Sequence, residues 1–223
     1  DAGIFIPDNS TQTYLPNSAT FATVRVATSQ DAILPRIITS AIDIYEPDLR
    51  ASVSYNDING GTVLPGDILE YTIVSKNIGS DLSVNTFLTD TLDQRLVYLP
   101  GSMQISYGPN TGPKTDAQDV DQAEFIIADN VIRARIGSGA NGTTGGTIVN
   151  SPEGADSTVL KFRVQLLDDC PVWQCGELLE NKAYLFGTGD ISGNPTSNDG
   201  ASDQTDINGC PSQETGNVFV DVG

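Results

Sequence analysis

Residues 158–167 read TVLKFRVQLL, and from Leu160 on every second side chain is apolar. The apolar positions are Leu160, Phe162, Val164 and Leu166. Between them lie Lys161, Arg163 and Gln165, which are polar. A period of two places these sets on opposite faces of an extended chain, so the stretch predicts a β-strand with one face in a core and one in solvent.

The same period recurs along the chain, and no stretch shows the 3.6-residue period of an amphipathic helix. The other predicted strands are 21–27, 36–45, 48–56, 68–75, 83–90, 95–99, 101–107, 122–128, 131–136, 177–187 and 216–222. Turn dipeptides such as Pro-Gly and Asn-Gly separate them. Many short strands without helices between them predict an all-β, antiparallel sandwich. Polar stretches at 108–121, 137–156 and 188–213 are expected to be long loops.

The charge balance excludes several classes of function. The chain carries 29 acidic and 11 basic residues, a net charge of -18, and no histidine. A surface this acidic repels phosphate backbones, which argues against nucleic-acid binding. Without histidine the chain has no Ser-His-Asp triad and no histidine-ligated metal site. No apolar run reaches the roughly 18 residues that a membrane-spanning helix requires.

The cysteines indicate an oxidising compartment but leave their pairing open. Cys170 and Cys175 flank a four-residue segment, and a small disulfide loop between them is the preferred arrangement. Cys210 would then be free or paired between molecules. A bond from Cys210 to either of the other two, or three reduced thiols, are the alternatives.

Residues 1–47 differ from the rest of the chain and are treated as a separate N-terminal segment. The strands predicted at 21–27 and 36–45 would form a hairpin with an apolar face, and an isolated hairpin is marginal in water. That face must be buried, either on the chain's own sandwich or by strand addition to a neighbouring subunit. Glu46-Pro47 marks the junction with a main domain at 48–223.

Two groups of carboxylates are candidate calcium sites, because calcium takes about six to eight oxygen ligands from flexible loops. The first candidate set is Asp199, Asp203, Asp206 and Asn208. The second is Asp116, Asp119, Asp121 and Glu124. Neither matches the spacing of a helix-flanked calcium loop, so solvated acidic loops are the alternative for both. Asn9 and Asn141 begin glycosylation triplets.

A series of short motifs from Asp48 onward, about three quarters of the chain, resembles a known family. The motifs are Val63-Leu64-Pro65-Gly66-Asp67, Leu69-Glu70-Tyr71-Thr72-Ile73, Asn77-Ile78-Gly79, Thr89-Asp90-Thr91-Leu92, Tyr98, Pro100-Gly101-Ser102 and Asn181-Lys182-Ala183. In order and spacing they resemble the bacterial and archaeal cell-surface repeat called domain of unknown function eleven. Asp93 stands where that family often has proline, which affects one turn.

The resemblance implies an immunoglobulin-like β-sandwich outside the cell, with no catalytic residues. The expected function is that of a non-enzymatic structural protein, a subunit of a surface filament or stalk. Its expected partners are copies of itself, joined head to tail through β-strand contacts of the N-terminal segment, or neighbouring repeat domains. The alternative is a calcium-stabilised adhesion module that binds a glycan or a protein.

Overall fold

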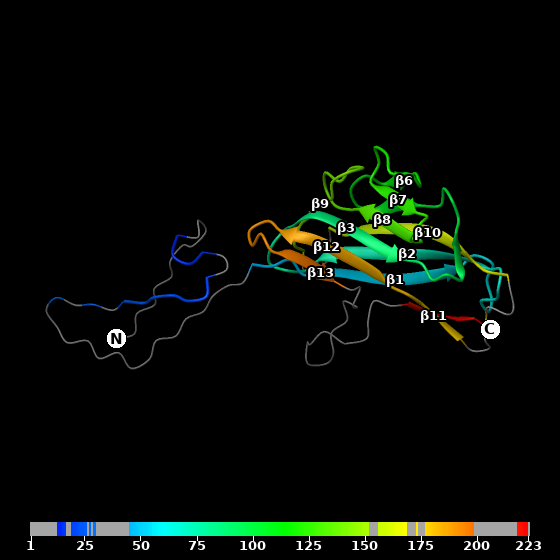
Figure 1. Cartoon of the computed structure of the whole chain (residues 1–223), viewed down its shortest axis with the longest axis horizontal. Helices are drawn as coiled ribbons and strands as arrows, with labels where there is room; N and C mark the ends of the chain where they lie inside the picture. Colours follow the sequence, from blue (N-terminus) through cyan, green and yellow to red (C-terminus); the bar gives the residue numbers. More distant parts are fainter. Residues whose placement is uncertain are drawn as a thin grey trace. The chain divides into compact units, whose positions relative to one another are not determined.

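The computed structural model describes residues 13–16, 19–25, 27, 29, 45–151, 156–168, 173, 177–198 and 218–222. Contacts between residues divide the chain into two units, Asp1–Asp43 and Ile44–Gly223, and each is described by itself. The described residues form strands and no helix (Figure 1). They therefore contain no helix with the length and apolar character that a membrane crossing requires.

The strands all belong to the second unit. Their bounds are β1 Leu49–Asp57, β2 Ile68–Asn77, β3 Ser83–Thr91, β4 Leu96–Tyr98, β5 Gln104–Tyr107, β6 Gly112–Pro113, β7 Ala123–Ile126, β8 Val131–Arg135, β9 Gly146–Ile148, β10 Thr158–Leu166, β11 Glu177–Asn181, β12 Ala183–Gly189, β13 Pro195–Asn198 and β14 Val218–Val222. Every pairing between these strands is antiparallel.

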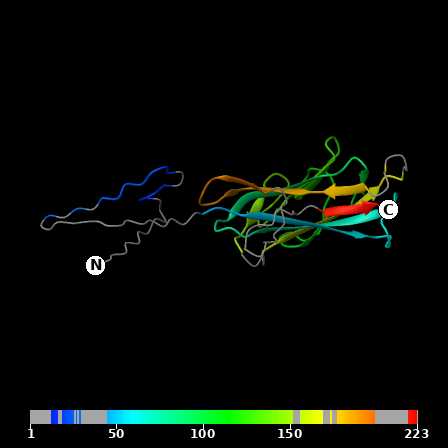
Figure 2. The ribbon, with the colours of Figure 1, turned by 90° about the horizontal axis from the view of Figure 1, so that it is seen from below.

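Two sheets build the sandwich, and a small third sheet pairs β11 with β14. The first sheet has the order β1-β2-β10-β5-β6, with β4 also on β10. The second has the order β13-β12-β3-β8-β7, with β9 also on β3. The orders β1-β2-β10-β5 and β13-β12-β3 correspond to strands ABED and GFC of an immunoglobulin domain. The predicted all-β, immunoglobulin-like sandwich is therefore confirmed, and Figure 2 shows most of its strands lying along one common axis.

The core lies where the alternating patterns of the two sheets meet. Tyr71 and Phe162 are fully buried neighbours, with ring centroids 5.6 Å apart. All four apolar side chains of the 158–167 stretch are buried, as predicted, while Lys161 and Arg163 point outward. Burial of each such large apolar side chain contributes about 1.5–3 kcal/mol.

Several loop predictions were wrong in detail. The expected loop 137–156 contains β9, which pairs with β3, and the expected loop 188–213 contains β13. The described residues of the predicted strand 21–27 belong to no strand. Of the predicted strand 36–45 only Tyr45 lies among the described residues, and it is in no strand either.

The strand predicted at 177–187 is divided at Lys182 into β11 and β12, and the strand that pairs with it is interrupted too. Leu185 pairs with Asn198, whereas Asn181 pairs with Val218. The step from Asn181 to Leu185 is four residues, whereas the step between their partners, from Asn198 to Val218, is twenty residues. Sixteen residues are therefore inserted into the last strand of the sandwich. The insertion falls within 199–217, outside the described residues.

Candidate functional site

The most deeply buried acidic group of the sandwich is Asp90, on β3. Its Oδ2 accepts a hydrogen bond of 2.9 Å from Nδ2 of Asn181, at the end of β11. Both residues are buried, and burial raises the pKa of the Asp90 carboxyl to about 7, partly opposed by the Asn181 bond. Asp90 Oδ1 and Asn181 Oδ1 have no hydrogen-bond partner. A protonated Asp90 supplies the donor that such a pair of acceptors needs.

A second buried carboxylate, Asp81, ties loops together. Its oxygens accept hydrogen bonds from the backbone N–H groups of Ile191 and Ser192, in the turn between β12 and β13. Asn77 joins the same corner, because Oδ1 accepts from Asp48 N–H and Nδ2 donates to the carbonyl of Asp81. These buried polar groups hold chain segments in place.

The carboxylates at 116–124 do not converge on a common point. Asp116 accepts from the Tyr98 hydroxyl and from Gly101 N–H. Asp119 accepts from Asp121 N–H and from the Thr115 hydroxyl, and both bonds lower the pKa of its carboxyl.

Glu124 instead forms an ion pair with Arg135, at 2.8 Å, and a longer one with Arg133. Among the residues that the structure describes, no three acidic or cysteine side chains form a group that could hold a metal. The carboxylates of Asp116, Asp119, Asp121 and Glu124 are instead engaged by hydrogen bonds and ion pairs within the protein, with Thr115 donating to both Asp119 and Asp121. Calcium binding by this set stays a prediction.

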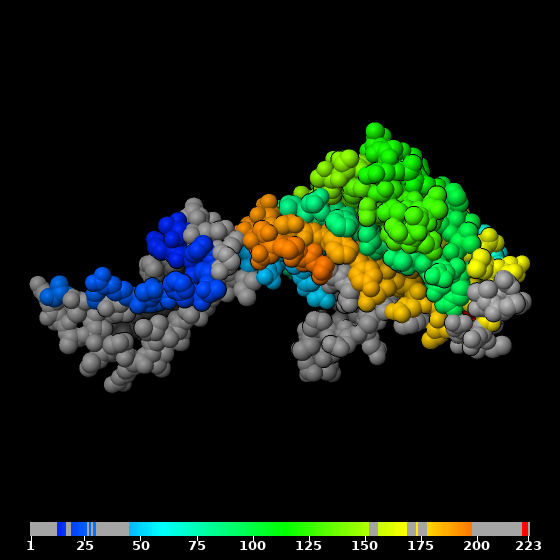
Figure 3. Space-filling view, viewed as in Figure 1, coloured from blue at the N-terminus to red at the C-terminus, as the bar shows by residue number. Residues whose placement is uncertain are grey.

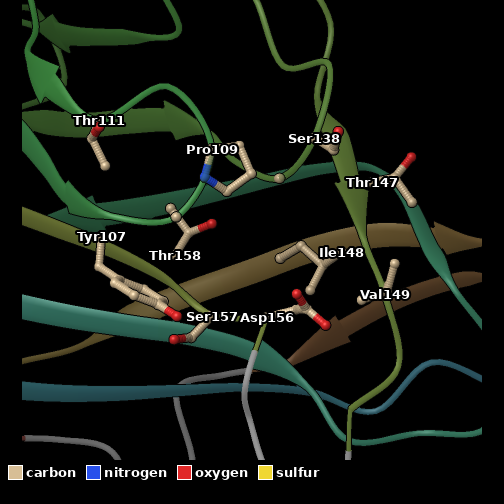
Figure 4. Close-up of a pocket in the computed structure, with 12 residues that line it drawn as sticks. Tyr107, Pro109, Thr111, Ser138, Thr147, Ile148, Val149, Asp156, Ser157 and Thr158 are labelled. Atoms are coloured by element: carbon tan, nitrogen blue, oxygen red, sulfur yellow. The ribbon is translucent and has the colours of Figure 1, made fainter.

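A pocket lies beside the end of β5, next to β9 and the start of β10. Its volume is about 420 Å³, which is within the usual range for small-ligand sites. Its lining combines Tyr107, Pro109, Ile148 and Val149 with the hydroxyls of serine and threonine residues and one carboxylate, Asp156 (Figure 4). The lining contains no basic side chain and no thiol. Such a surface suits binding of a neutral, hydroxyl-rich ligand better than acid–base or nucleophilic chemistry.

Most site residues predicted from the sequence lie outside the described residues. They are Asp199, Asp203, Asp206, Asn208, Cys170, Cys175, Cys210 and Asn9. Asn141 is described and exposed, and its Oδ1 accepts hydrogen bonds from the backbone N–H groups of Thr143 and Thr144. Its glycosylation stays a prediction.

Sequence reasoning missed the pocket and the Asp90–Asn181 pair. The pocket joins residues about 50 positions apart, 107–111 with 156–158, and no local pattern signals that meeting. Asp90 and Asn181 both belong to motifs of the family resemblance, but only the fold places them in contact.

Several solved structures are similar to this chain at low sequence identity. The major pilin SpaD of Corynebacterium diphtheriae is 16% identical, with 68% of this chain and 33% of that chain covered and a TM-score of 0.43. The collagen binding domain of surface protein RspB of Erysipelothrix rhusiopathiae is 12% identical, with 78% and 45% covered and a TM-score of 0.40. AvmM, which catalyses macrocyclization in alchivemycin A biosynthesis, is 12% identical, with 78% and 89% covered and a TM-score of 0.36.

The chain thus spans a third to a half of the length of the first two proteins. No family model matches the chain, and no curated protein matches it. The fold assignment above depends on the chain's own strand order.

Proposed function

We propose that the protein is a non-enzymatic, extracellular structural protein, a subunit of a surface filament or stalk. The sandwich would be the body of each subunit, and the N-terminal segment would join it to the next. The resemblance to the cell-surface repeat family is the origin of this proposal. The buried polar groups Asp81, Asp90 and Glu124, each bonded within the sandwich, agree with a structural role.

The observation that carries the proposal is the exposure of large apolar side chains in the N-terminal unit. Tyr14 is 65%, Phe21 81% and Val24 66% exposed. They fall within eleven residues, in a unit that groups separately from the sandwich by its contacts. Large apolar side chains that are exposed so close along the chain favour a segment that another molecule would cover. The acceptor would be a sheet edge of the next subunit, and the described edges are β1, β6, β7 and β13.

The test is electron microscopy of the full-length chain and of a variant that lacks residues 1–43. The cut preserves Glu46, whose carbonyl accepts hydrogen bonds from Ser80 and Asp81 N–H at the start of the sandwich. We expect filaments from the full chain and none from the truncated one. The double variant Phe21→Asp and Val24→Asp should behave like the truncation, with Thr23→Asp as control. Filaments from the truncated chain, or none from the full chain, would contradict the proposal.

A second candidate function is adhesion, and the pocket beside β5 favours it. Tyr107 offers an aromatic ring, and the surrounding hydroxyls and Asp156 offer hydrogen bonds, which together suit a sugar. Calcium bound by Asp199, Asp203, Asp206 and Asn208 would stabilise this module. Calcium that binds only the folded state raises the melting temperature with its concentration. An unchanged melting temperature in millimolar calcium would contradict the calcium part of this alternative.

The pocket is tested separately, by a glycan-binding screen that compares the wild type with Tyr107→Ala.

A further inference from the structure

The outward face of the first sheet is basic in a strongly acidic molecule. Among the described residues of β1, β2 and β10, four basic side chains project from it and one acidic side chain. The basic residues are Arg50 on β1, Lys76 on β2, and Lys161 and Arg163 on β10. The acidic one is Glu70 on β2, and Asp48, just before β1, binds Arg50 at 2.7 Å.

One carboxylate on this face serves two cations. Lys161 and Arg163 lie 3.2 and 3.0 Å from the two oxygens of Glu70. Burial opposes ionisation of Glu70, but the bonds from Arg163 and Lys161 outweigh it and lower the pKa of that carboxyl. The carboxylate is therefore charged at neutral pH and still leaves one positive charge in excess. Arg50 and Lys76, which are cross-strand partners, lie toward the other end of the strands.

Between the two basic ends lies an apolar row. Val74, Val159 and Tyr107 are cross-strand partners on β2, β10 and β5, and Tyr107 is exposed. Ser52 of β1 continues the row. An apolar centre with a charged rim is the usual anatomy of a protein interface.

The chain itself carries a surface of complementary chemistry, along the edge strand β7. Val120 and Ile127 flank β7 and are 92% and 83% exposed, the highest values for large apolar side chains in the sandwich. Exposed carboxylates lie beside them, Asp119 next to Val120 and Asp129 near Ile127. Figure 3 shows the green atoms, from the middle of the chain, at the top of the second unit.

We propose that the basic outward face of β1, β2, β10 and β5 binds the acidic β7 edge of a second copy of this chain. Val120 and Ile127 would meet the apolar row, and Asp119 and Asp129 would meet the basic rim. The contact joins two different surfaces, so it continues from copy to copy. It deepens the proposed function, because it gives subunits with a charge of -18 a mutually attractive face.

The size of the face indicates a weak contact. Four strands about 4.8 Å apart and about eight residues long cover roughly 500 Å². A stable interface buries about 800 Å² on each partner. The contact would therefore support the assembly beside the N-terminal segment rather than replace it.

The test is a charge-swap experiment in the full-length chain. Phe21→Asp and Val24→Asp are included in every sample, so that N-terminal docking does not contribute. Sedimentation equilibrium is measured at one ionic strength for this parent, for added Lys161→Glu, and for added Asp119→Lys with Asp129→Lys. We expect the parent to associate weakly, and each added change to weaken association at least about tenfold. An equimolar mixture of the two changed proteins should associate again, because the acidic edge of one meets the basic face of the other.

Lys182→Glu is the matched control, because it makes the same charge change where Lys182 lies over the Tyr184 ring, off the first sheet. It should leave association unchanged. Equal weakening by Lys182→Glu, or no recovery in the mixture, would overturn the proposed contact. So would a parent that stays monomeric at high concentration and binds only an anionic polymer such as dextran sulfate. Loss of filaments on truncation of residues 1–43 is independent of all these results.

Discussion

Asp90 and Asn181 form a polar pair in the core. Apolar side chains at these two positions would remove a specific contact between β3 and β11. Burial raises the pKa of the Tyr71 hydroxyl, and the nearby charge of Asp90 raises it further. The negative charge of Asp93 adds to this rise in the pKa of Tyr71. The Tyr71 hydroxyl has no hydrogen-bond partner either, and burial favours the neutral forms of Tyr71 and Asp90.

The free energy of unfolding should therefore fall as pH rises toward neutrality, because the raised pKa of Asp90 favours its protonated form in the folded state. Its pKa is raised from an ordinary 3.8 to about 7, so the folded state binds the proton more tightly than the unfolded state. The stabilisation is fully present below about pH 4 and is lost as pH rises through about 7, by up to about 4 kcal/mol. Asp90→Asn imitates the protonated acid and should remove this dependence. The measurement is urea unfolding of both proteins between pH 4 and pH 8.

Comparison with Asp90→Asn also corrects for groups whose ionisation changes stability with pH in the opposite direction. Hydrogen bonds from Arg95 lower the pKa of Asp93, and Glu70 is likewise lowered, so both lose stabilisation at acid pH. Because wild type and Asp90→Asn share these groups, only the difference between the two proteins reports on Asp90. That difference should favour Asp90→Asn increasingly toward pH 7. A constant difference across the range would show that Asp90 ionises normally in the folded state.

The strands with a clear period of two could be predicted, because each buries one face and the sequence records that alternation. β10 and β2 are the best examples, with buried and half-buried residues in strict alternation along β2. β9 and β13 could not be predicted, since β9 has only three residues and β13 has four polar or turn-forming residues without an apolar alternation. They become strands only because β3 and β12 offer them backbone partners. For the same reason the pocket, which adjoins β9, had no signal in the sequence.

Trp173 shows a similar limit at a loop. The residues around it in the sequence show no alternation that would indicate whether its ring is buried. Its indole N–H donates to the Leu167 carbonyl at 2.8 Å, and the guanidinium of Arg95 lies 5.0 Å from the ring centroid. Trp173 packs against the core.

The interrupted last strand leads to a prediction about its insertion. Deletion of residues 200–215 leaves three residues between Asn198 and Val218, opposite Lys182–Tyr184, so β13 and β14 can join as one strand. A shorter connection costs less entropy on folding, and we expect stabilisation of about 1–2 kcal/mol. Thermal unfolding followed by circular dichroism measures this. A variant with sixteen glycine and serine residues in place of 200–215 separates length from composition and should not gain stability. A deletion variant that fails to fold would mean that the insertion supports the sandwich.

Across the molecule, charge is distributed unevenly. Ion pairs concentrate on the outward faces of the sheets, at Glu70 and Glu124, while many carboxylates lie in loops. The partly exposed pairs at Glu70 contribute little, about 0–1 kcal/mol each, whereas the Glu124–Arg135 pair is buried. Repulsion among the remaining charges should therefore dominate the response to salt.

We expect the melting temperature to rise with sodium chloride. The screening length falls from about 30 Å at 0.01 M to about 8 Å at 0.15 M, which weakens repulsion across the whole surface. Thermal unfolding at pH 7 over this range is the measurement. A variant with Asp119→Asn and Asp129→Asn, which removes two exposed loop charges, should respond less. A melting temperature that falls with salt would show that the ion pairs at Glu70 and Glu124 outweigh repulsion.

The first strand also determines how the sandwich bears mechanical load. β1 pairs with β2 over nine consecutive residues, from Leu49 to Asp57. Its start and the C-terminus lie at opposite ends of the sandwich (Figure 1). A pull on the chain before Glu46 would therefore act along β1, in shear, and all nine pairs would resist together instead of opening one by one. The rate of forced unfolding depends on this barrier, so a subunit anchored through its N-terminal side would withstand traction better than its equilibrium stability suggests.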